Sequence, residues 1–132
     1  MKKKGKILVV DDNEEINVAL RLFLSTAFES VITERNPEML VPRMTRENID
    51  VIILDMNFKA GINSGNEGLY WLNRVRAIDP TVSVVFITAY AGIELAVSAI
   101  QQGAVDFIEK PWDDEKLMAT VLKAWELRRS KL

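Results

Sequence analysis

The chain contains neither cysteine nor histidine. Without cysteine it has no disulfide framework and no thiolate nucleophile. Without histidine it lacks the base of a Ser-His-Asp triad and the ligands of nearly every common zinc site. Any bound metal must therefore be held by oxygen atoms, which favours Mg²⁺, with Mn²⁺ or Ca²⁺ as possible substitutes.

Long apolar runs and a strong charge of either sign are also absent. The formal net charge is −2, which gives no electrostatic basis for direct contact with nucleic acid. The lysine-rich start is followed by only four apolar residues before Asp11, too few for a signal peptide or a membrane span. We therefore expect a cytoplasmic protein without a membrane segment, in which residues 1–5 form a basic, solvated tail.

The 132 residues, 48% of them hydrophobic and 27% charged, are typical of one globular domain with its own core. Short apolar runs alternate with longer segments of helical period. Strands are expected at 7–10, 30–33, 51–54, 82–87 and 106–109. Helices are expected at 16–27, from 37 with a kink or late start at Pro42, at 69–78, at 93–102 with Gly103 as C-cap, and at 114–129. This alternation predicts an α/β fold, a doubly wound five-stranded parallel sheet with five helices.

Four of these strands end in polar residues that suit a metal ion and a phosphoryl group. The residues are Asp11-Asp12, Asp55, Thr88 and Lys110. In an open parallel sheet the carboxyl ends of the strands meet at one edge, where ligands bind. Three carboxylates form an oxygen ligand set for Mg²⁺, and a lysine with a hydroxyl can neutralise phosphoryl oxygens.

Each of these residues also has a plain structural interpretation. Asp11 and Asp12 could cap the first helix, Thr88 could cap the fourth, and Lys110 could be a surface lysine. Only their convergence on one edge favours a site.

With Thr88-Ala89 and then Lys110-Pro111 following the aspartates in this order, the chain resembles the CheY-like receiver domain of two-component response regulators over nearly all its length. The stretch from Thr88 to Trp112 is most similar to receivers of the nitrogen-regulator type, which activate sigma-54 transcription. The resemblance implies strand order 2-1-3-4-5 and a signalling switch, with no turnover chemistry beyond self-phosphorylation and autodephosphorylation.

The resemblance also implies a reacting group and a metal site. Asp55 would accept a phosphoryl group from the phosphohistidine of a sensor histidine kinase or from a small phosphodonor. Asp11, Asp12, Asp55 and the backbone carbonyl of Asn57 would hold Mg²⁺.

Further residues would transmit the signal. Thr88 would bond a phosphoryl oxygen, Lys110 would pair with it, and Phe107 would change rotamer as part of the switch. The fourth helix, fifth strand and fifth helix would report the state to an output domain or protein that regulates transcription, and could form a homodimer. Asn57 and Tyr90 would tune the lifetime of the phosphoryl group, which we expect to hydrolyse slowly.

The loop after Asp55 departs from the family pattern. Lys59 stands where receivers usually have proline, and Gly68 follows Asp55 by thirteen positions. The simplest explanation is an insertion of about five residues within 58–66. Either a flexible insertion or a lid or docking element fits this stretch, but no Gly-Lys-Ser/Thr follows, which excludes a Walker A motif.

Two other functions compete with the phosphoacceptor switch. A haloacid-dehalogenase-type phosphohydrolase needs a second aspartate two residues after its nucleophile, whereas position 57 is asparagine. A receiver-shaped adaptor that signals without phosphorylation would not need the full set of polar strand ends. We expect residues 1–132 to be a single receiver domain, either stand-alone or the N-terminal part of a longer regulator.

Overall fold

Five strands alternate with helices along the computed structural model, which describes residues 1–56, 66–89 and 93–132. The strands are β1 (Lys3–Val10), β2 (Phe28–Glu34), β3 (Val51–Asp55), β4 (Ser83–Thr88) and β5 (Asp106–Glu109). The helices are α1 (Glu14–Leu24), α2 (Leu40–Arg46), α3 (Asn66–Ile78), α4 (Ile93–Gln101) and α5 (Asp114–Ser130), with a short 3-10 turn η1 (Pro37–Met39) before α2.

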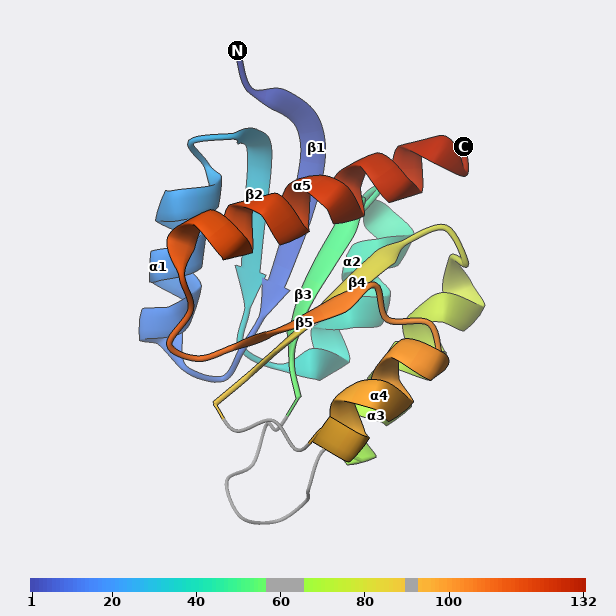
Figure 1. Cartoon of the computed structure of the whole chain (residues 1–132). Coiled ribbons are helices and arrows are strands. Elements are labelled where there is room, and N and C mark those ends of the chain that lie inside the picture. Colours follow the sequence, from blue (N-terminus) through green and yellow to red (C-terminus); the bar gives the residue numbers. More distant parts are fainter. Residues whose placement is uncertain (57–65, 90–92) are drawn as a thin grey trace.

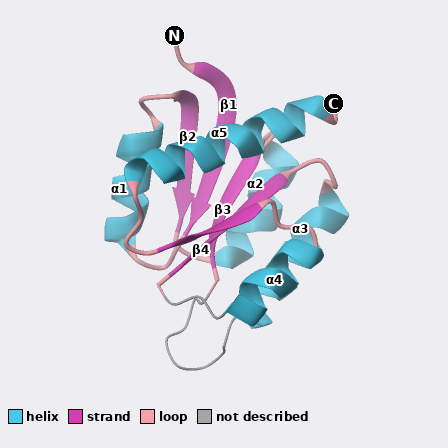
Figure 2. Ribbon diagram, viewed as in Figure 1, coloured by secondary structure: helices cyan, strands magenta, loops and turns pink. Residues whose placement is uncertain are grey.

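All neighbouring strands pair in parallel, in the order β2-β1-β3-β4-β5. Figure 2 shows the strands as a central layer between helices, with their arrowheads pointing to the same edge. The expected doubly wound parallel sheet, its strand order and its five helices are confirmed. Both chain termini lie toward the opposite edge (Figure 1).

Alternating side chains of the central strands fill two separate cores. Ile7, Val9 and Ile53 point to the face covered by α1 and α5, where Leu20 and Val121 pack on them. Leu8, Val10, Ile52 and Leu54 point to the other face, which α2, α3 and α4 cover (Figure 1). Because both faces are covered, the inner strands β3 and β4 are wholly buried and apolar apart from Ser83 and their last residues.

The prediction that residues 1–5 form a solvated tail is wrong for residues 3–5, because β1 begins at Lys3. Lys3 is already in register with Phe28 of β2. Gly5 is buried, and a side chain there would collide with the Trp125 indole, whose Nε1 would lie 2.5 Å from the new Cβ. The start of β1 therefore packs under α5, and the lysine-rich sequence does not indicate this contact.

Proline and glycine bound two helices as the sequence predicts. The α-helix α2 starts late, at Leu40, so Pro42 lies in its first turn, where a missing N–H costs little. Gly103, just after α4, has φ 113°, a left-handed conformation that favours glycine at a helix end. No helix in the described part of the chain is long and apolar enough to cross a bilayer.

Candidate functional site

Sheet register brings the polar strand ends together. Val10 is paired with Leu54, so Asp11 and Asp55 follow at the same level on adjacent strands. Further across the sheet, Thr88 is paired with Glu109, and Lys110 comes next. The backbone N–H of Lys110 donates to the carbonyl of Thr88 at 2.7 Å, and this hydrogen bond holds Lys110 beside the end of β4. The predicted convergence is therefore present in the fold.

Three carboxylates form a cluster at this edge. Oxygen atoms of Asp11, Asp12 and Asp55 all lie within 4.8 Å of one another. Asp11 is fully buried and Asp55 nearly so, whereas Asp12 is exposed. Negative groups this close repel one another, so the cluster favours a cation.

Lys110 supplies a positive charge to two of these carboxylates. Its Nζ lies 2.7 Å from Oδ2 of Asp11 and 3.7 Å from Oδ1 of Asp55. The peptide bond between Lys110 and Pro111 is cis. The direct pair with Asp11 was not expected from the sequence, which assigned the lysine only to a phosphoryl group.

Asp12 faces a groove that opens to solvent. Partial desolvation of its carboxyl, followed by the negative charge of Asp11 and a hydrogen bond with Asp11, raises the pKa of Asp12. The groove has a volume of about 460 Å³, and Arg35, Glu67 and Trp71 also line it. Asp12 is thus the member of the cluster that is most accessible from outside.

Sequence reasoning missed residues that hold the aspartate backbone in place. Asn17, fully buried on α1, donates through Nδ2 to the carbonyls of Asp11 at 2.8 Å and Glu34 at 3.3 Å. Arg35 donates from Nε to the carbonyl of Asp12 at 3.1 Å. A polar residue at an inward helical position, between Ile16 and Leu20, was the signal that could have identified Asn17.

The two predicted switch residues lie on adjacent strands. Thr88 is the last residue of β4 and is only 1% exposed, so it is buried at the carboxyl edge of the sheet. Phe107 is half-buried in β5, where it packs against the core under α2, α3 and α4. Asn57, Tyr90 and most of the long loop, residues 58–65, lie outside the described residues.

Comparison with known proteins gives a consistent family. Residues 7–122 match the model of the response regulator receiver domain. The chain is 30% identical to the DNA-binding transcriptional regulator NtrC of Salmonella typhimurium over 122 residues, 92% of this chain and 25% of that protein. It is 32% identical to the alginate biosynthesis transcriptional regulatory protein AlgB of Pseudomonas aeruginosa over 127 residues, 96% of this chain and 27% of that protein. The chain thus spans about a quarter of these relatives.

Solved structures agree with the sequence relatives. The N-terminal signal receiver domain of a Bacteroides fragilis response regulator is 43% identical, with a TM-score of 0.83, and the match covers 93% of this chain and 98% of that one. The beryllofluoride-activated receiver domain dimer of NtrC4 is 28% identical, with a TM-score of 0.80 and the same coverage. The resemblance to nitrogen-regulator receivers is confirmed. The carboxyl edge of the parallel sheet gathers three aspartates and a lysine. Because the family model also matches almost the whole chain, the chain belongs to the response regulator receiver domain family.

Proposed function

We propose that this domain is a phosphoacceptor switch in which Asp55 takes a phosphoryl group from the phosphohistidine of a sensor histidine kinase. The observation that carries the proposal is the position of Asp55, nearly buried among two other aspartates and 3.7 Å from the ammonium of Lys110. A carboxylate held beside a lysine ammonium can react with a phosphoryl group, and the ammonium can then neutralise the charge of the product.

The donor set fits a magnesium ion. Carboxylate oxygens are the ligands that Mg²⁺ prefers, and those of Asp11, Asp12 and Asp55 are close enough to share one ion. The backbone carbonyl of Asn57 would complete the protein ligands. When bound, the ion supplies positive charge that neutralises the carboxylates and the incoming phosphoryl oxygens.

Asp55, Lys110 and Thr88 would then bind and transfer the phosphoryl group. An Oδ atom of Asp55 forms a bond to phosphorus as the phosphorus–nitrogen bond of the donor breaks, and the released imidazole takes a proton from solvent. Lys110 moves from Asp11 toward a phosphoryl oxygen, and the hydroxyl of Thr88 donates to another. Asn57 and Tyr90 would set the lifetime of the product, which Tyr90→Ala should shorten in a dephosphorylation assay.

The α4–β5–α5 face would report the phosphorylated state. Movement of Thr88 toward the phosphoryl group would let Phe107 change rotamer and alter this face. Val97 and Ile100 on α4 are 48% and 45% exposed, which gives the face apolar surface for a homodimer or an output partner. Residues 1–132 would thus act as one cytoplasmic receiver domain that regulates transcription through another domain or protein, without touching nucleic acid itself.

Intact-mass analysis tests the proposal directly. Wild type is incubated with phosphoramidate, whose phosphorus–nitrogen bond resembles that of phosphohistidine, and with acetyl phosphate, each with Mg²⁺ or with EDTA. We expect one phosphoryl adduct with Mg²⁺, little with EDTA, and none on Asp55→Asn. The matched control is Asp113→Asn, because Asp113 is exposed and its side chain makes no capping hydrogen bond. Absence of an adduct on wild type with every donor would favour an adaptor that signals without phosphorylation.

A further inference from the structure

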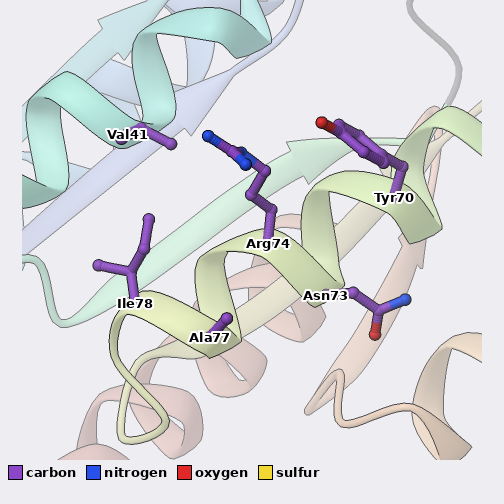
Figure 3. A pocket seen from close by; sticks show the side chains of 6 residues that line it. All are labelled: Val41, Tyr70, Asn73, Arg74, Ala77 and Ile78. Atoms are coloured by element: carbon purple, nitrogen blue, oxygen red, sulfur yellow. The ribbon is translucent and has the colours of Figure 1, made fainter.

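A groove lies between α2 and α3, on the face of the sheet opposite α1 and α5. Its volume is about 480 Å³. Six residues line it, one from α2 and five from α3: Val41, Tyr70, Asn73, Arg74, Ala77 and Ile78. Figure 3 shows these side chains along the outer side of α3 and across from it on α2. None of them belongs to the carboxylate cluster or to the α4–β5–α5 face.

Helix α3 has a second apolar side that the domain core does not use. Leu72 and Val75 are fully buried against the sheet, whereas Tyr70 and Ile78 are 56% and 40% exposed. Tyr70, Arg74 and Ile78 follow one another at intervals of four residues, so they share one outer side of the helix. Large apolar side chains that gather on an exposed side mark a surface available for binding.

Arg74 gives this apolar side a specific charge. Its side chain extends from α3 into the space between Val41 and Tyr70 (Figure 3). No lining residue is acidic, and within the described part of the chain no carboxylate pairs with Arg74. At the edge toward α4, Asn73 donates to Gln102 at 3.1 Å and is already engaged. A guanidinium set in apolar surface is complementary to a carboxylate flanked by apolar side chains.

We propose that this groove binds an amphipathic helix of a partner protein, with a carboxylate of that helix on Arg74. Apolar side chains of the partner, one turn to either side of the carboxylate, would pack on Tyr70, Val41 and Ile78. Two neighbouring helices with apolar side chains along the groove between them provide the type of surface on which a helix lays its apolar face. This binding site is separate from the Asp55 chemistry and does not depend on phosphorylation.

A titration followed by amide chemical shifts tests the proposal. The probe is a blocked helical peptide of about 15 residues, with leucines on one side and glutamates beside them. Its partner peptide has every glutamate replaced by lysine. Both are added to the labelled full chain in EDTA without phosphodonor. We expect shifts centred on residues 41, 70, 74, 77 and 78, and binding of the glutamate peptide that is roughly threefold to tenfold tighter.

Charge reversal separates the groove from general electrostatic attraction. Wild type should bind the glutamate peptide more tightly than the lysine peptide. Arg74→Glu should reverse this preference and bind the lysine peptide more tightly. Arg21→Glu makes the same change in net charge at an exposed position of α1, on the other face of the sheet, and this variant should still bind the glutamate peptide more tightly, as wild type does. Ile78→Ser should weaken both peptides, and thermal unfolding checks that each variant is folded. Equal binding of the two peptides, no binding at millimolar concentration, or shifts centred on α1 or α4 would overturn the proposal.

Discussion

The Nζ atom of Lys110 lies 2.7 Å from Oδ2 of Asp11, although 99 residues separate them in the chain. Asp11 is fully buried, and its Oδ1 accepts a hydrogen bond from the backbone N–H of Asn13 at 2.9 Å. The lysine thus neutralises a buried carboxylate in the absence of a phosphoryl group. It also links the residues that follow β1 and β5 at the carboxyl edge of the sheet.

Replacing Lys110 should destabilise the metal-free domain. In Lys110→Met, Asp11 keeps its buried charge but loses the neighbouring positive charge, while Asp12 and Asp55 still repel it. We expect a loss of about 1–3 kcal/mol in the free energy of unfolding, measured by urea titration in EDTA. Addition of Mg²⁺ should reduce the difference in the free energy of unfolding between wild type and Lys110→Met, because a divalent cation can replace the ammonium.

Lys116→Met is the matched control for that experiment. Lys116 is exposed on α5, so the same substitution there should change the free energy of unfolding by less than about 0.5 kcal/mol. If Lys110→Met and Lys116→Met were equally stable in EDTA, the pair with Asp11 would contribute nothing to folding.

The effect of Asp12→Asn on stability should change sign with Mg²⁺. Partial desolvation and the charge of Asp11 raise the pKa of Asp12, so its ionised form is unfavourable in the folded state. This cost is present at neutral pH and would be relieved as the pH falls through the raised pKa. A neutral amide removes the cost, and in EDTA at pH 7 the variant should melt at or above the wild-type temperature.

With Mg²⁺ present, wild type should instead melt at a higher temperature than Asp12→Asn. Wild type gains stability from a bound ion, whereas Asp12→Asn has lost an accessible ligand and gains less. Differential scanning fluorimetry with increasing Mg²⁺ measures both curves. An increase in melting temperature that is identical for the two proteins would show that Asp12 does not hold the ion.

The other end of the sheet depends on a buried arginine. Arg128 on α5 is 3% exposed and pairs with Asp50 at 2.6 Å and Asp79 at 3.3 Å. Its NH2 also donates to Oδ1 of Asn48 at 2.8 Å. One side chain therefore connects α5 to the segments that precede β3 and β4, at the edge opposite the carboxylate cluster.

This network predicts that stability decreases in acid. Burial acts to raise the pKa of Asp79, but hydrogen bonds from Thr81 and Arg128 outweigh it, and the net effect lowers the pKa below its ordinary value of 3.8. The ionised form therefore stabilises the fold above about pH 4, and this contribution is lost as the pH falls through the lowered pKa.

Asp79→Asn isolates this contribution. The amide oxygen can still accept from Thr81, but the charge on Arg128 is no longer balanced at this position. At pH 7 the variant should be about 1 kcal/mol less stable than wild type in urea titrations, and the gap should shrink toward pH 3. A gap that stays constant from pH 7 to pH 3 would contradict the assignment.

The main features of the fold and of the site edge were predictable from the sequence for a geometric reason. Parallel strands deliver whatever follows them to one edge, so Asp11, Asp55, Thr88 and Lys110 meet regardless of how their side chains are arranged.

Side-chain partners were much less predictable. Arg128 follows Ala124 on the inner side of α5, but a base near a helix end also suits the helix dipole, so the sequence alone favoured that interpretation. Its partners Asn48, Asp50 and Asp79 come from two separate connections. The hydrogen bonds of Asn17 and the pairing of Lys110 with Asp11 likewise depend on distances that local sequence does not encode.

The last prediction concerns Gly68, in the first turn of α3. A Cβ at this position would lie 2.9 Å from the backbone carbonyl oxygen of Met56 and 3.1 Å from the ring of Phe86. The contact with Met56 involves backbone, so it cannot be relieved by a side-chain rotation. Because Met56 directly follows Asp55, a shift of α3 away from this carbonyl would also disturb the strand end that carries the reacting group.

Gly68→Ala should therefore destabilise the domain although alanine is the better helix former. Helix propensity alone favours the substitution by about 1 kcal/mol, so any net loss in the free energy of unfolding reports the steric contact. Ala77→Gly, at an exposed position of the same helix, measures the propensity term separately and should cost about 1 kcal/mol. We expect both variants to be less stable than wild type in urea, and Gly68→Ala also to be phosphorylated more slowly by acetyl phosphate. A stabilised Gly68→Ala would mean that α3 can move away from Met56 without cost.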